Sequence, residues 1–246
     1  MIFQERISKI MSLIEKKGTV SNADLIKILK SSEATIRRDL DYLEKENKLK
    51  RVRGGAISFR MVEEEMPIDM KEELELPAKK EIARLASRFI EDGDSIYLDA
   101  GTTTNELIEY IKDKKIRVVT NGLMHIEKLL RYSIETCLLG GRIKRKTKAI
   151  IGTRAVEDLE DFSFDKAFIG VNGINEFDGY TTHDLEEALL KRKAMKKAKK
   201  AYVLADSTKF DIAYFSNIAK LNEATIITNQ KNISEKILRL TEVINN

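Results

Sequence analysis

The chain has few of the residues that define several common protein classes. It contains a single cysteine, Cys137, and no tryptophan in 246 residues. One cysteine cannot form an intrachain disulfide, and its place in the apolar run Cys137-Leu138-Leu139 predicts a small core residue. No apolar run approaches the roughly 18 residues of a membrane span, and the first residues have no signal-peptide layout. We therefore expect a globular, cytoplasmic protein with no membrane partner.

Histidine is almost as scarce, and this limits the chemistry that the chain can support. His125 and His183 stand alone, with no cysteine partner and no ligand spacing, so we expect no metal site and no other cofactor. Ser207 follows Asp206, but neither histidine has the sequence context of a general base that would activate this serine as a nucleophile. The sequence therefore predicts no catalytic residue.

The net charge of +4 is modest, but it is unevenly distributed. Residues 1–57 hold 13 lysines and arginines against eight acids, a net charge of +5, which leaves the remaining 189 residues at −1. A basic segment joined to a nearly neutral one is typical of a phosphate-binding module with a partner domain. A solvated lysine-rich surface is the alternative.

Three short helices are predicted in the basic segment. Ile7, Ile10, Met11 and Ile14 follow helical spacing over residues 3–17. Ser21 precedes Asp24 by three residues, as at a helix start, and residues 25–29 continue the pattern. A third helix is expected over residues 33–46, with Ile36, Leu40 and Leu43 facing inward. A basic strand and a Gly-Gly turn follow, with a second strand at residues 56–59.

Helix, serine turn, arginine-bearing helix and basic hairpin in this order predict a winged helix-turn-helix over residues 1–57. A guanidinium matches phosphate or guanine bidentately, and Thr35 suits a phosphate or a thymine methyl group. The cations of the hairpin are expected to grip the DNA backbone. The predicted DNA-binding residues are Ser32, Thr35, Arg37, Arg38, Lys50, Arg51 and Arg53.

An acidic stretch, residues 58–75, is interpreted as a linker, with an acidic helix in part of it as the alternative; of the two prolines of the chain, Pro67 lies within it and Pro77 just after it. From residue 76 to residue 246, strand-length apolar runs alternate with helical patterns. Such alternation predicts an α/β domain with a mainly parallel sheet, whose ligands bind at the carboxyl ends of the strands. The expected strands are residues 95–98, 116–119, 136–139, 167–171, 201–204 and 224–227.

Four loops of this domain are candidate binding segments. Asp99-Ala100-Gly101-Thr102-Thr103-Thr104 joins a strand to a helix, where a glycine, hydroxyls and free N–H groups suit a phosphate. Thr120-Asn121-Gly122 and Gly140-Gly141-Arg142 leave neighbouring strands and suit sugar hydroxyls, although such turns are common. In Asp206-Ser207-Thr208-Lys209, the lysine would neutralise a phosphate and the acid would orient a hydroxyl. The ten residues 191–200 hold seven cations and no acid and are interpreted mainly as a solvated helix face.

These motifs resemble the DeoR family of bacterial transcription regulators along nearly the entire chain. Thr35-Ile36-Arg37-Arg38-Asp39-Leu40 and Arg51-Val52-Arg53-Gly54-Gly55-Ala56 are similar to its helix-turn-helix and wing signature. Asp99 to Thr104, Leu139-Gly140-Gly141, Glu187-Ala188 and Ala205 to Phe210 are similar to its sensor domain. The family often has a histidine where this chain has Arg53 and a glycine near Asn47. The resemblance implies a regulator, usually a repressor of carbohydrate-uptake or catabolic genes, that responds to a phosphorylated sugar.

The second domain also resembles ribose-5-phosphate isomerase in its Gly-Thr-Thr and Asp-Ser-Thr-Lys loops. A sugar-phosphate isomerase with an attached DNA-binding domain is therefore the alternative. Lys191 stands where that enzyme's motif has its general-base glutamate, which favours binding without turnover, although Glu186 and Glu187 are close by. The expected partners are a double-stranded DNA operator, a sugar phosphate and further copies of the chain, because paired half-sites require paired readers. The predicted effector-binding residues are Asp99, Gly101, Thr102, Thr103, Thr104, Asn121, Gly140, Gly141, Glu187, Lys191, Asp206 and Lys209.

Overall fold

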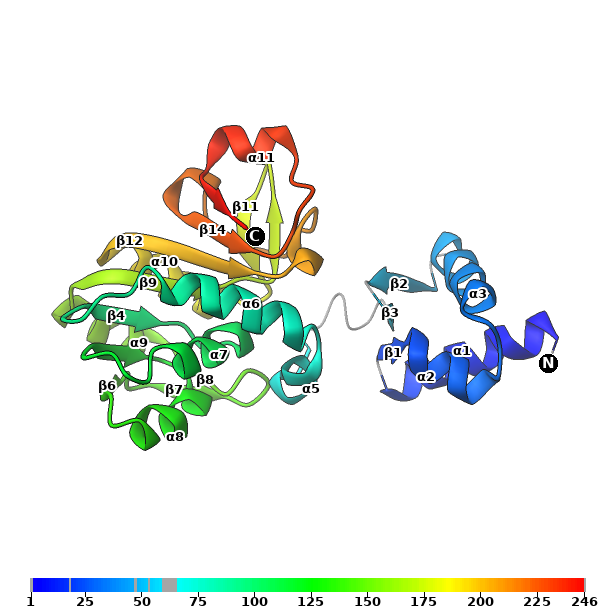
Figure 1. The fold of residues 1–246 in the computed structure, drawn as a ribbon, viewed down its shortest axis with the longest axis horizontal. Helices are drawn as coiled ribbons and strands as arrows, with labels where there is room; N and C mark the ends of the chain where they lie inside the picture. The colour runs from blue at the N-terminus through cyan, green and yellow to red at the C-terminus, as the bar shows by residue number, and fades with distance from the viewer. Residues whose placement is uncertain (1, 18, 47, 53, 59–65, 246) are drawn as a thin grey trace. The chain divides into compact units, whose positions relative to one another are not determined.

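The computed structural model describes residues 2–17, 19–46, 48–52, 54–58 and 66–245 (Figure 1). The chain divides into two compact units, Met1–Met66 and Pro67–Asn246, and each is described by itself. Arg53 of the expected wing lies outside the described residues, as do residues 59–65 of the expected linker. No helix in the described part of the chain is both long enough and apolar enough to cross a bilayer.

The first unit consists of three helices and a small antiparallel sheet in the order β1-β3-β2. Ile10, Ile14, Leu25, Ile36 and Leu40 have no exposed surface, so one face of every helix contributes to a shared core. The elements are α1 (Phe3–Lys17), β1 (Thr19–Ser21), α2 (Asn22–Leu29), α3 (Glu33–Lys45), β2 (Leu49–Val52) and β3 (Gly55–Ser58).

The expected hairpin is present, and it gains a third strand that the sequence did not predict. β3 pairs with β2, and it also pairs with β1 through Val20 and Ala56. A Cβ atom at Gly55 would lie 2.0 Å from the carbonyl oxygen of Val20. Glycine is therefore required at this position for the two strands to approach.

The second unit is an α/β domain of larger size. Its helices are α5 (Ile68–Glu73), α6 (Leu76–Ser87), α7 (Thr102–Tyr110), α8 (Leu123–Arg131), α9 (Thr153–Asp158), α10 (Leu185–Lys196) and α11 (Glu235–Leu240). Its strands are β4 (Ser95–Leu98), β5 (Arg117–Thr120), β6 (Glu135–Leu138), β7 (Arg142–Lys144), β8 (Ala149–Ile151), β9 (Phe164–Gly170), β10 (Gly173–Asn175), β11 (Gly179–Thr182), β12 (Ala198–Ala205), β13 (Ser216–Ala219), β14 (Thr225–Thr228) and β15 (Val243–Ile244).

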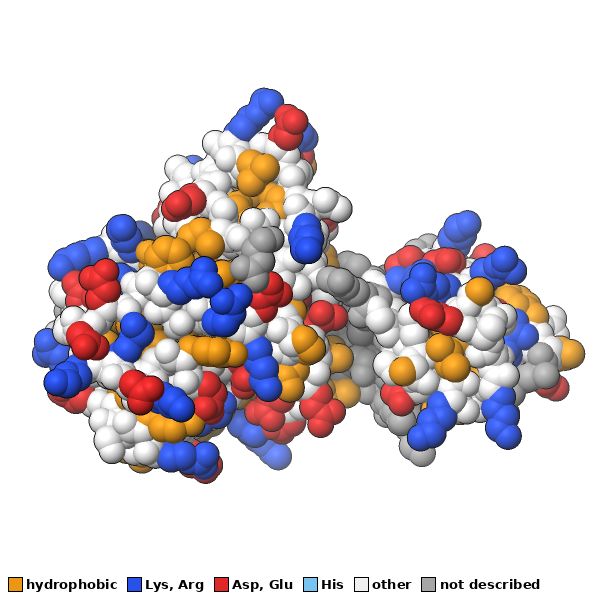
Figure 2. Space-filling view, viewed as in Figure 1, with side chains coloured by type: hydrophobic (Ala, Val, Ile, Leu, Met, Phe, Trp, Pro, Cys, Tyr) orange, Lys and Arg blue, Asp and Glu red, His pale blue; other side chains and the backbone are white. Residues whose placement is uncertain are grey.

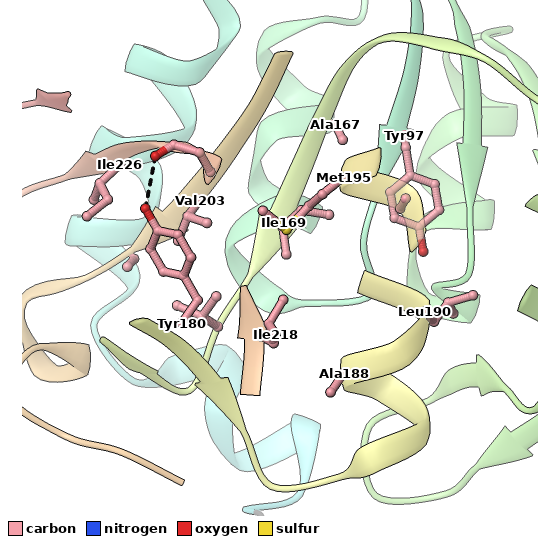
Figure 3. Packing of buried hydrophobic residues seen from close by; sticks show 14 of the residues in the cluster. Tyr97, Ala167, Ile169, Tyr180, Ala188, Leu190, Met195, Val203, Ile218 and Ile226 are labelled. Carbon is pink, nitrogen blue, oxygen red and sulfur yellow. Dashed lines mark hydrogen bonds between the residues drawn. The ribbon is translucent and has the colours of Figure 1, made fainter. Parts of the chain in front are cut away.

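A seven-stranded sheet in the order β15-β14-β12-β9-β4-β5-β6 forms the centre of this unit, and its strand pairs are parallel. Alternate residues of the central strands belong to different core clusters: on β4, Tyr97 lies in one, whereas Ile96 and Leu98 lie in the other. Side chains of α9 and α10 complete the first cluster, part of which Figure 3 shows, and those of α6, α7 and α8 complete the second. A doubly covered parallel sheet confirms the expected fold class.

Two smaller sheets were not predicted. β7 and β8 form an antiparallel hairpin, and β10, β11 and β13 form a three-stranded sheet. The hydroxyl of Tyr180 on β11 donates to the carbonyl oxygens of Leu221 and Ala224, at 3.1 and 2.9 Å, which fastens this sheet to the main core. The strands are three or four residues long, and such short runs carry little periodicity.

The expectation that Cys137 is a core residue was wrong, because its side chain is exposed. β6 is an edge strand of the main sheet and pairs only with β5 among the described strands. Leu138 is 42% exposed, whereas Leu139, beyond the strand, is 2% exposed. The apolar run therefore has one buried end and one exposed end.

Part of the expected linker belongs to the second unit. Residues 68–73 form α5, the acidic helix that was the alternative interpretation of this stretch. Ile68 is 3% exposed, and its N–H group donates to the carbonyl oxygen of Lys146 at 2.7 Å. α5 is therefore packed against the α/β domain.

Candidate DNA and effector sites

The recognition helix expected from the sequence is α3. The side chain of Ser32 caps it by accepting the N–H of Thr35 at 3.3 Å, and the two hydroxyls lie 2.9 Å apart. Asp39, on the inner side, receives Nε and Nη2 of Arg6 at 2.6 and 3.0 Å. This two-pronged pair fixes α3 against α1, so the exposed side of α3 is held on a rigid support.

Arg37 and Arg38 are both exposed on this helix. Arg37 pairs with Glu33 at 2.6 Å, one turn earlier, in an exposed contact that a phosphate could replace at little cost. Arg51 is different: its guanidinium pairs with Asp41, and its N–H donates to Glu44 at 2.7 Å. In this structure Arg51 therefore joins the wing to α3.

The other predicted contacts of the wing are less well defined. The backbone of Lys50 lies in β2, its side chain is not described, and Arg53 lies outside the described residues. In the view of Figure 2, basic side chains of the first unit alternate with acidic ones and form no single patch. The exposed arginines of α3 are thus the best defined candidates for DNA contact.

In the second unit, the predicted effector residues Asp99 and Lys191 form a buried ion pair. Asp99 follows β4, Lys191 lies on α10, and their side chains are 1% and 7% exposed. The same carboxylate oxygen accepts the N–H of Gly170 at 2.9 Å, at the end of β9. Burial raises the pKa of Asp99, and Lys191 and Gly170 oppose that shift. The pair therefore joins the ends of β4 and β9 to α10, at the edge of the sheet where a ligand was expected.

The threonine loop, residues 99–104, has one threonine that bonds internally and two that do not do so in the described contacts. The Thr104 hydroxyl donates to the carbonyl oxygens of Asp99 and Gly101, at 2.6 and 2.9 Å, so it stabilises the loop and is not aimed at a ligand. Thr103 is 9% exposed and Thr102 is half-buried. Gly101 is the N-cap of α7 without a side-chain hydrogen bond, which leaves this helix end suited to an anion.

Asn121 also has an internal role. Its Oδ1 accepts from the Ala100 N–H at 2.8 Å and from the Tyr97 hydroxyl at 3.0 Å, and its Nδ2 donates to the Ile150 carbonyl at 3.2 Å. Both ends of the amide are therefore engaged. Asn121 positions the loop of residues 99–104 through Ala100, and the interpretation that it is free to meet sugar hydroxyls finds no support in this geometry.

His125 is a fully buried neighbour of the same loop that the sequence did not single out as a site residue. Thr120 donates its hydroxyl proton to Leu98 at 2.7 Å, so the 2.8 Å contact requires His125 Nδ1 to donate to Thr120. Burial lowers the pKa of His125 to about 4. A neutral imidazole therefore supports the loop near neutral pH.

Gly140 and Gly141 are not brought to the Asp99–Lys191 pair by any described contact. The Gly140 N–H donates to Asp158 at 2.7 Å. A Cβ atom at Gly141 would lie 2.7 Å from the carbonyl oxygen of Ile151, and its φ of +140° also favours glycine. The two glycines therefore allow the chain to pass close to α9 and β8.

Glu187 lies one turn before Lys191 on α10 and is 5% exposed. It accepts the hydroxyl of Thr147 at 2.8 Å and the ammonium of Lys144 at 3.2 Å. Both partners belong to the β7–β8 hairpin. Glu187 is thus engaged in the contact between this hairpin and α10.

Lysines and an acid gather at the loop after β12. Asp206 is 2% exposed and accepts the N–H of Thr208 at 2.9 Å, and Lys209 Nζ lies 3.9 Å from it. Burial alone would raise the pKa of Asp206, but Lys209, Thr208 and Lys79 together hold it below its usual value. Lys79 of α6 is 4% exposed, and burial lowers its pKa to about 8, with Asp206 opposing and Lys209 and Lys71 adding to the shift.

Lys79 was not among the site residues predicted from the sequence, where it stands next to a second lysine, Lys80. The helical pattern contained the signal, since Lys79 lies three residues before Ile82 and four before Ala83, which are both buried. Thr147 and Lys144 were missed because their hairpin was not predicted. No local pattern joins them to Glu187, 40 and 43 residues later.

A hollow of about 310 Å³ is lined by residues of α5, α6, α7 and α8, and Thr102 is the predicted site residue in its lining. Glu72, Glu73 and Glu106 face it, against one cation, Lys128. An anion would be repelled there. Among the described residues, no group of three or more histidine, cysteine or acidic side chains is arranged to hold a metal ion.

Two family models match the chain, and they cover both units. The DeoR-like helix-turn-helix domain matches residues 6–61, and the DeoR C terminal sensor domain matches residues 75–230.

Similar proteins that are named as regulators match over almost their full length. The chain is 47% identical over 229 residues to the uncharacterized HTH-type transcriptional regulator FruR of Bacillus subtilis, covering 93% of this chain and 91% of the relative. It is 33% identical to the lactose phosphotransferase system repressor of Streptococcus mutans, covering 98% of this chain and 99% of the relative.

Among solved structures, ribose 5-phosphate isomerase A of Methanocaldococcus jannaschii is 16% identical, with a TM-score of 0.41 over 54% of this chain and 53% of that chain.

Proposed function

The chain belongs to the DeoR family of transcriptional regulators, and we propose that it represses genes of carbohydrate uptake or catabolism until a phosphorylated sugar binds its second unit. The first unit binds the operator, with Arg37 and Arg38 at the DNA and Ser32 and Thr35 at the start of the same helix. The name of the Streptococcus mutans relative, lactose phosphotransferase system repressor, supports both the sign of regulation and the class of target gene.

The observation that favours an anionic effector is the charge at the end of β12. The Asp206 carboxylate interacts with the ammonium groups of Lys79 and Lys209, and Lys79 and Asp206 are almost fully buried, whereas Lys209 is 31% exposed. Glu106 also acts on Lys79, but Lys71 and Lys209 oppose it, and positive charge in a partly buried site attracts an anion. The N-terminal end of α7 follows β4, which is separated from β12 by β9 and runs parallel to both, so it lies at the same edge of the sheet. Thr102, Thr103 and Lys209 are therefore proposed to hold the phosphate.

The sugar portion is proposed to extend towards the Asp99–Lys191 pair, with Glu187 next to it. Lys191 is an ammonium donor to Asp99, and a protonated lysine does not abstract a proton. We therefore propose binding without turnover and no enzymatic activity. The alternative of a sugar-phosphate isomerase predicts conversion of ribose 5-phosphate by the purified protein, which a ketose assay measures directly.

We further propose that the protein acts as a symmetric oligomer in the bacterial cytoplasm, where its operator is. Two recognition helices related by a twofold axis can occupy two half-sites, and doubling the contact area raises specificity.

DNA binding by the full chain is tested first, with labelled duplexes that tile the region upstream of its own gene. Fluorescence anisotropy is measured without effector and with ribose 5-phosphate, fructose 1-phosphate, fructose 6-phosphate, glucose 6-phosphate or inorganic phosphate. We expect specific binding to one duplex and its loss with at least one sugar phosphate. Absence of specific binding under every condition would remove the regulator function.

The effector site is tested with Lys209→Met, and with Lys112→Met as a matched control beyond the far end of α7. Lys209→Met should leave DNA affinity unchanged and weaken the sugar-phosphate response about tenfold or more, because a charged hydrogen bond in a partly buried site contributes roughly 1.5–3 kcal/mol. Lys112→Met should respond like the wild type. If Lys209→Met also responds normally, the phosphate assignment is wrong.

A further inference from the structure

α5 is the first helix of the second unit, and it follows directly on the residues that lead from the DNA-binding unit. Two of its contacts go to the turn of the β7–β8 hairpin: the Ile68 N–H donates to Lys146 at 2.7 Å, and Asp69 pairs with Lys148. The buried side chain of Ile68 adds an apolar contact. The position of α5 therefore depends on this hairpin.

The other side of the same hairpin contacts α10 beside the proposed effector site. Lys144 lies 3.1 Å from Asp184 and 3.2 Å from Glu187, and Thr147 donates to Glu187 at 2.8 Å. Thr147 and Glu187 are each 5% exposed, so this hydrogen bond is shielded from water. One turn further along α10, Lys191 pairs with Asp99.

A second support of α5 leads to the same site. Nζ of Lys79 donates to the carbonyl oxygen of Lys71 in α5. The same ammonium lies in the electrostatic field of Asp206, Lys209 and Glu106. Two of the segments that contact α5, the β7–β8 hairpin and α6, thus also adjoin the proposed effector site.

We propose that α5 and the β7–β8 hairpin form the coupling element of this regulator, so that occupation of the effector site alters how α5 is held. The inference rests on the proposed function. An anionic ligand near Lys191 and Lys209 alters the electrostatic field at Glu187, Lys144 and Lys79. Glu187 and Lys144 hold the hairpin against α10, and Lys79 holds α5. Displacement of α5 changes the start of the connection to the DNA-binding unit, which is how one site biases the other.

Thr147→Val tests the coupling without replacing a residue that is proposed to contact DNA or the effector, although it changes one partner of Glu187. Valine keeps the shape of threonine and removes the hydrogen bond to Glu187. Thr225→Val is the matched control, because Thr225 also donates to a glutamate, Glu242, at 3.1 Å, on β14. The probe is the member of the panel above that weakens DNA binding of the wild type most.

For Thr147→Val we expect DNA affinity without probe, and probe affinity without DNA, to stay within about twofold of wild type. The factor by which the saturating probe weakens DNA binding should fall about three- to tenfold. Thr225→Val should retain the full factor. Hydrogen exchange of residues 66–76 should change on probe binding in the wild type and in Thr225→Val, and much less in Thr147→Val.

Exchanging the charges of Asp69 and Lys148 gives a second, independent test of the coupling. Asp69→Lys and Lys148→Asp should each reduce the coupling factor, and the double variant should restore it, since aspartate tolerates the left-handed backbone at residue 148, where φ is +51°. If the wild type responds to the probe and all of these variants respond equally, the coupling element is wrong while the proposed function stands. If the wild type responds to no member of the panel, the proposed function fails, and the coupling element fails with it.

Discussion

Replacing Lys191 by methionine tests how the buried ion pair with Asp99 is balanced. The variant leaves a carboxylate that is 1% exposed, with the Gly170 N–H as its remaining described partner. Removing one member of a buried pair generally costs about 3–5 kcal/mol. The aspartate can limit that cost by taking up a proton in the folded state.

The free energy needed to protonate Asp99 sets the largest cost that the variant can incur, and it follows from the unfolded pKa of aspartate, about 3.9. At pH 7, protonating the carboxyl group costs about 4 kcal/mol, and at pH 5 about 1.5 kcal/mol. The folded pKa of Asp99 in Lys191→Met is raised, so the variant's deficit relative to wild type should shrink as the pH falls. Asp99→Asn/Lys191→Met has no charge to bury and should cost less than about 1.5 kcal/mol at either pH.

Urea-induced unfolding at pH 7 and pH 5, followed by tyrosine fluorescence, measures these differences. The chain has no tryptophan, and six of its seven tyrosines lie in the second unit, so the signal reports mainly on that unit. A deficit of Lys191→Met that is equal at both pH values, or a double variant no more stable than Lys191→Met, would refute the reasoning.

Arg38→Ala should weaken operator binding and lower the slope of log affinity against log salt by about one, because one phosphate or base contact is lost; Lys112→Ala, tested by the same anisotropy titrations, should not. An unchanged slope would mean that Arg38 does not meet the DNA. His125 has a folded pKa of about 4, below its unfolded value of about 6.5, so unfolding takes up a proton between these pH values and stability falls by up to about 3 kcal/mol as the pH drops from 6.5 to 4. In urea titrations His125→Asn should lack this component, and an equal pH dependence in both proteins would contradict it. The exposed Cys137 should react with Ellman's reagent as quickly in the native protein as in urea, and a protected thiol would place β6 in an interface.

Local structure was the most predictable part of this protein. Ser32 was predicted at the turn before α3, and Ile36, Leu40 and Leu43 were predicted on its inner face, because caps and helical spacing act within one or two turns. β1 was not predicted, since its three residues form a strand only where β3 passes beside them.

The candidate site shows the same division between local and distant effects. The Gly-Thr-Thr loop was identified, but the sequence did not separate Thr104, which bonds internally, from Thr102 and Thr103. Asn121 was predicted to face a sugar, and its amide is instead satisfied by three protein partners. A residue's type states which bonds it can make, and only the neighbouring strands decide which of them it does make.

The sequence by itself determined the order of the domains, the helix that carries Arg37 and Arg38, and the loops that follow the parallel strands, because periodicity, caps and turn residues are properties of short segments. Tertiary structure alone decided that Cys137 lies on an edge strand, that Lys79 is buried beside Asp206, and that Thr147 meets Glu187. These facts depend on the order in which the strands pair and on contacts between residues far apart in the chain. No local pattern encodes either of them.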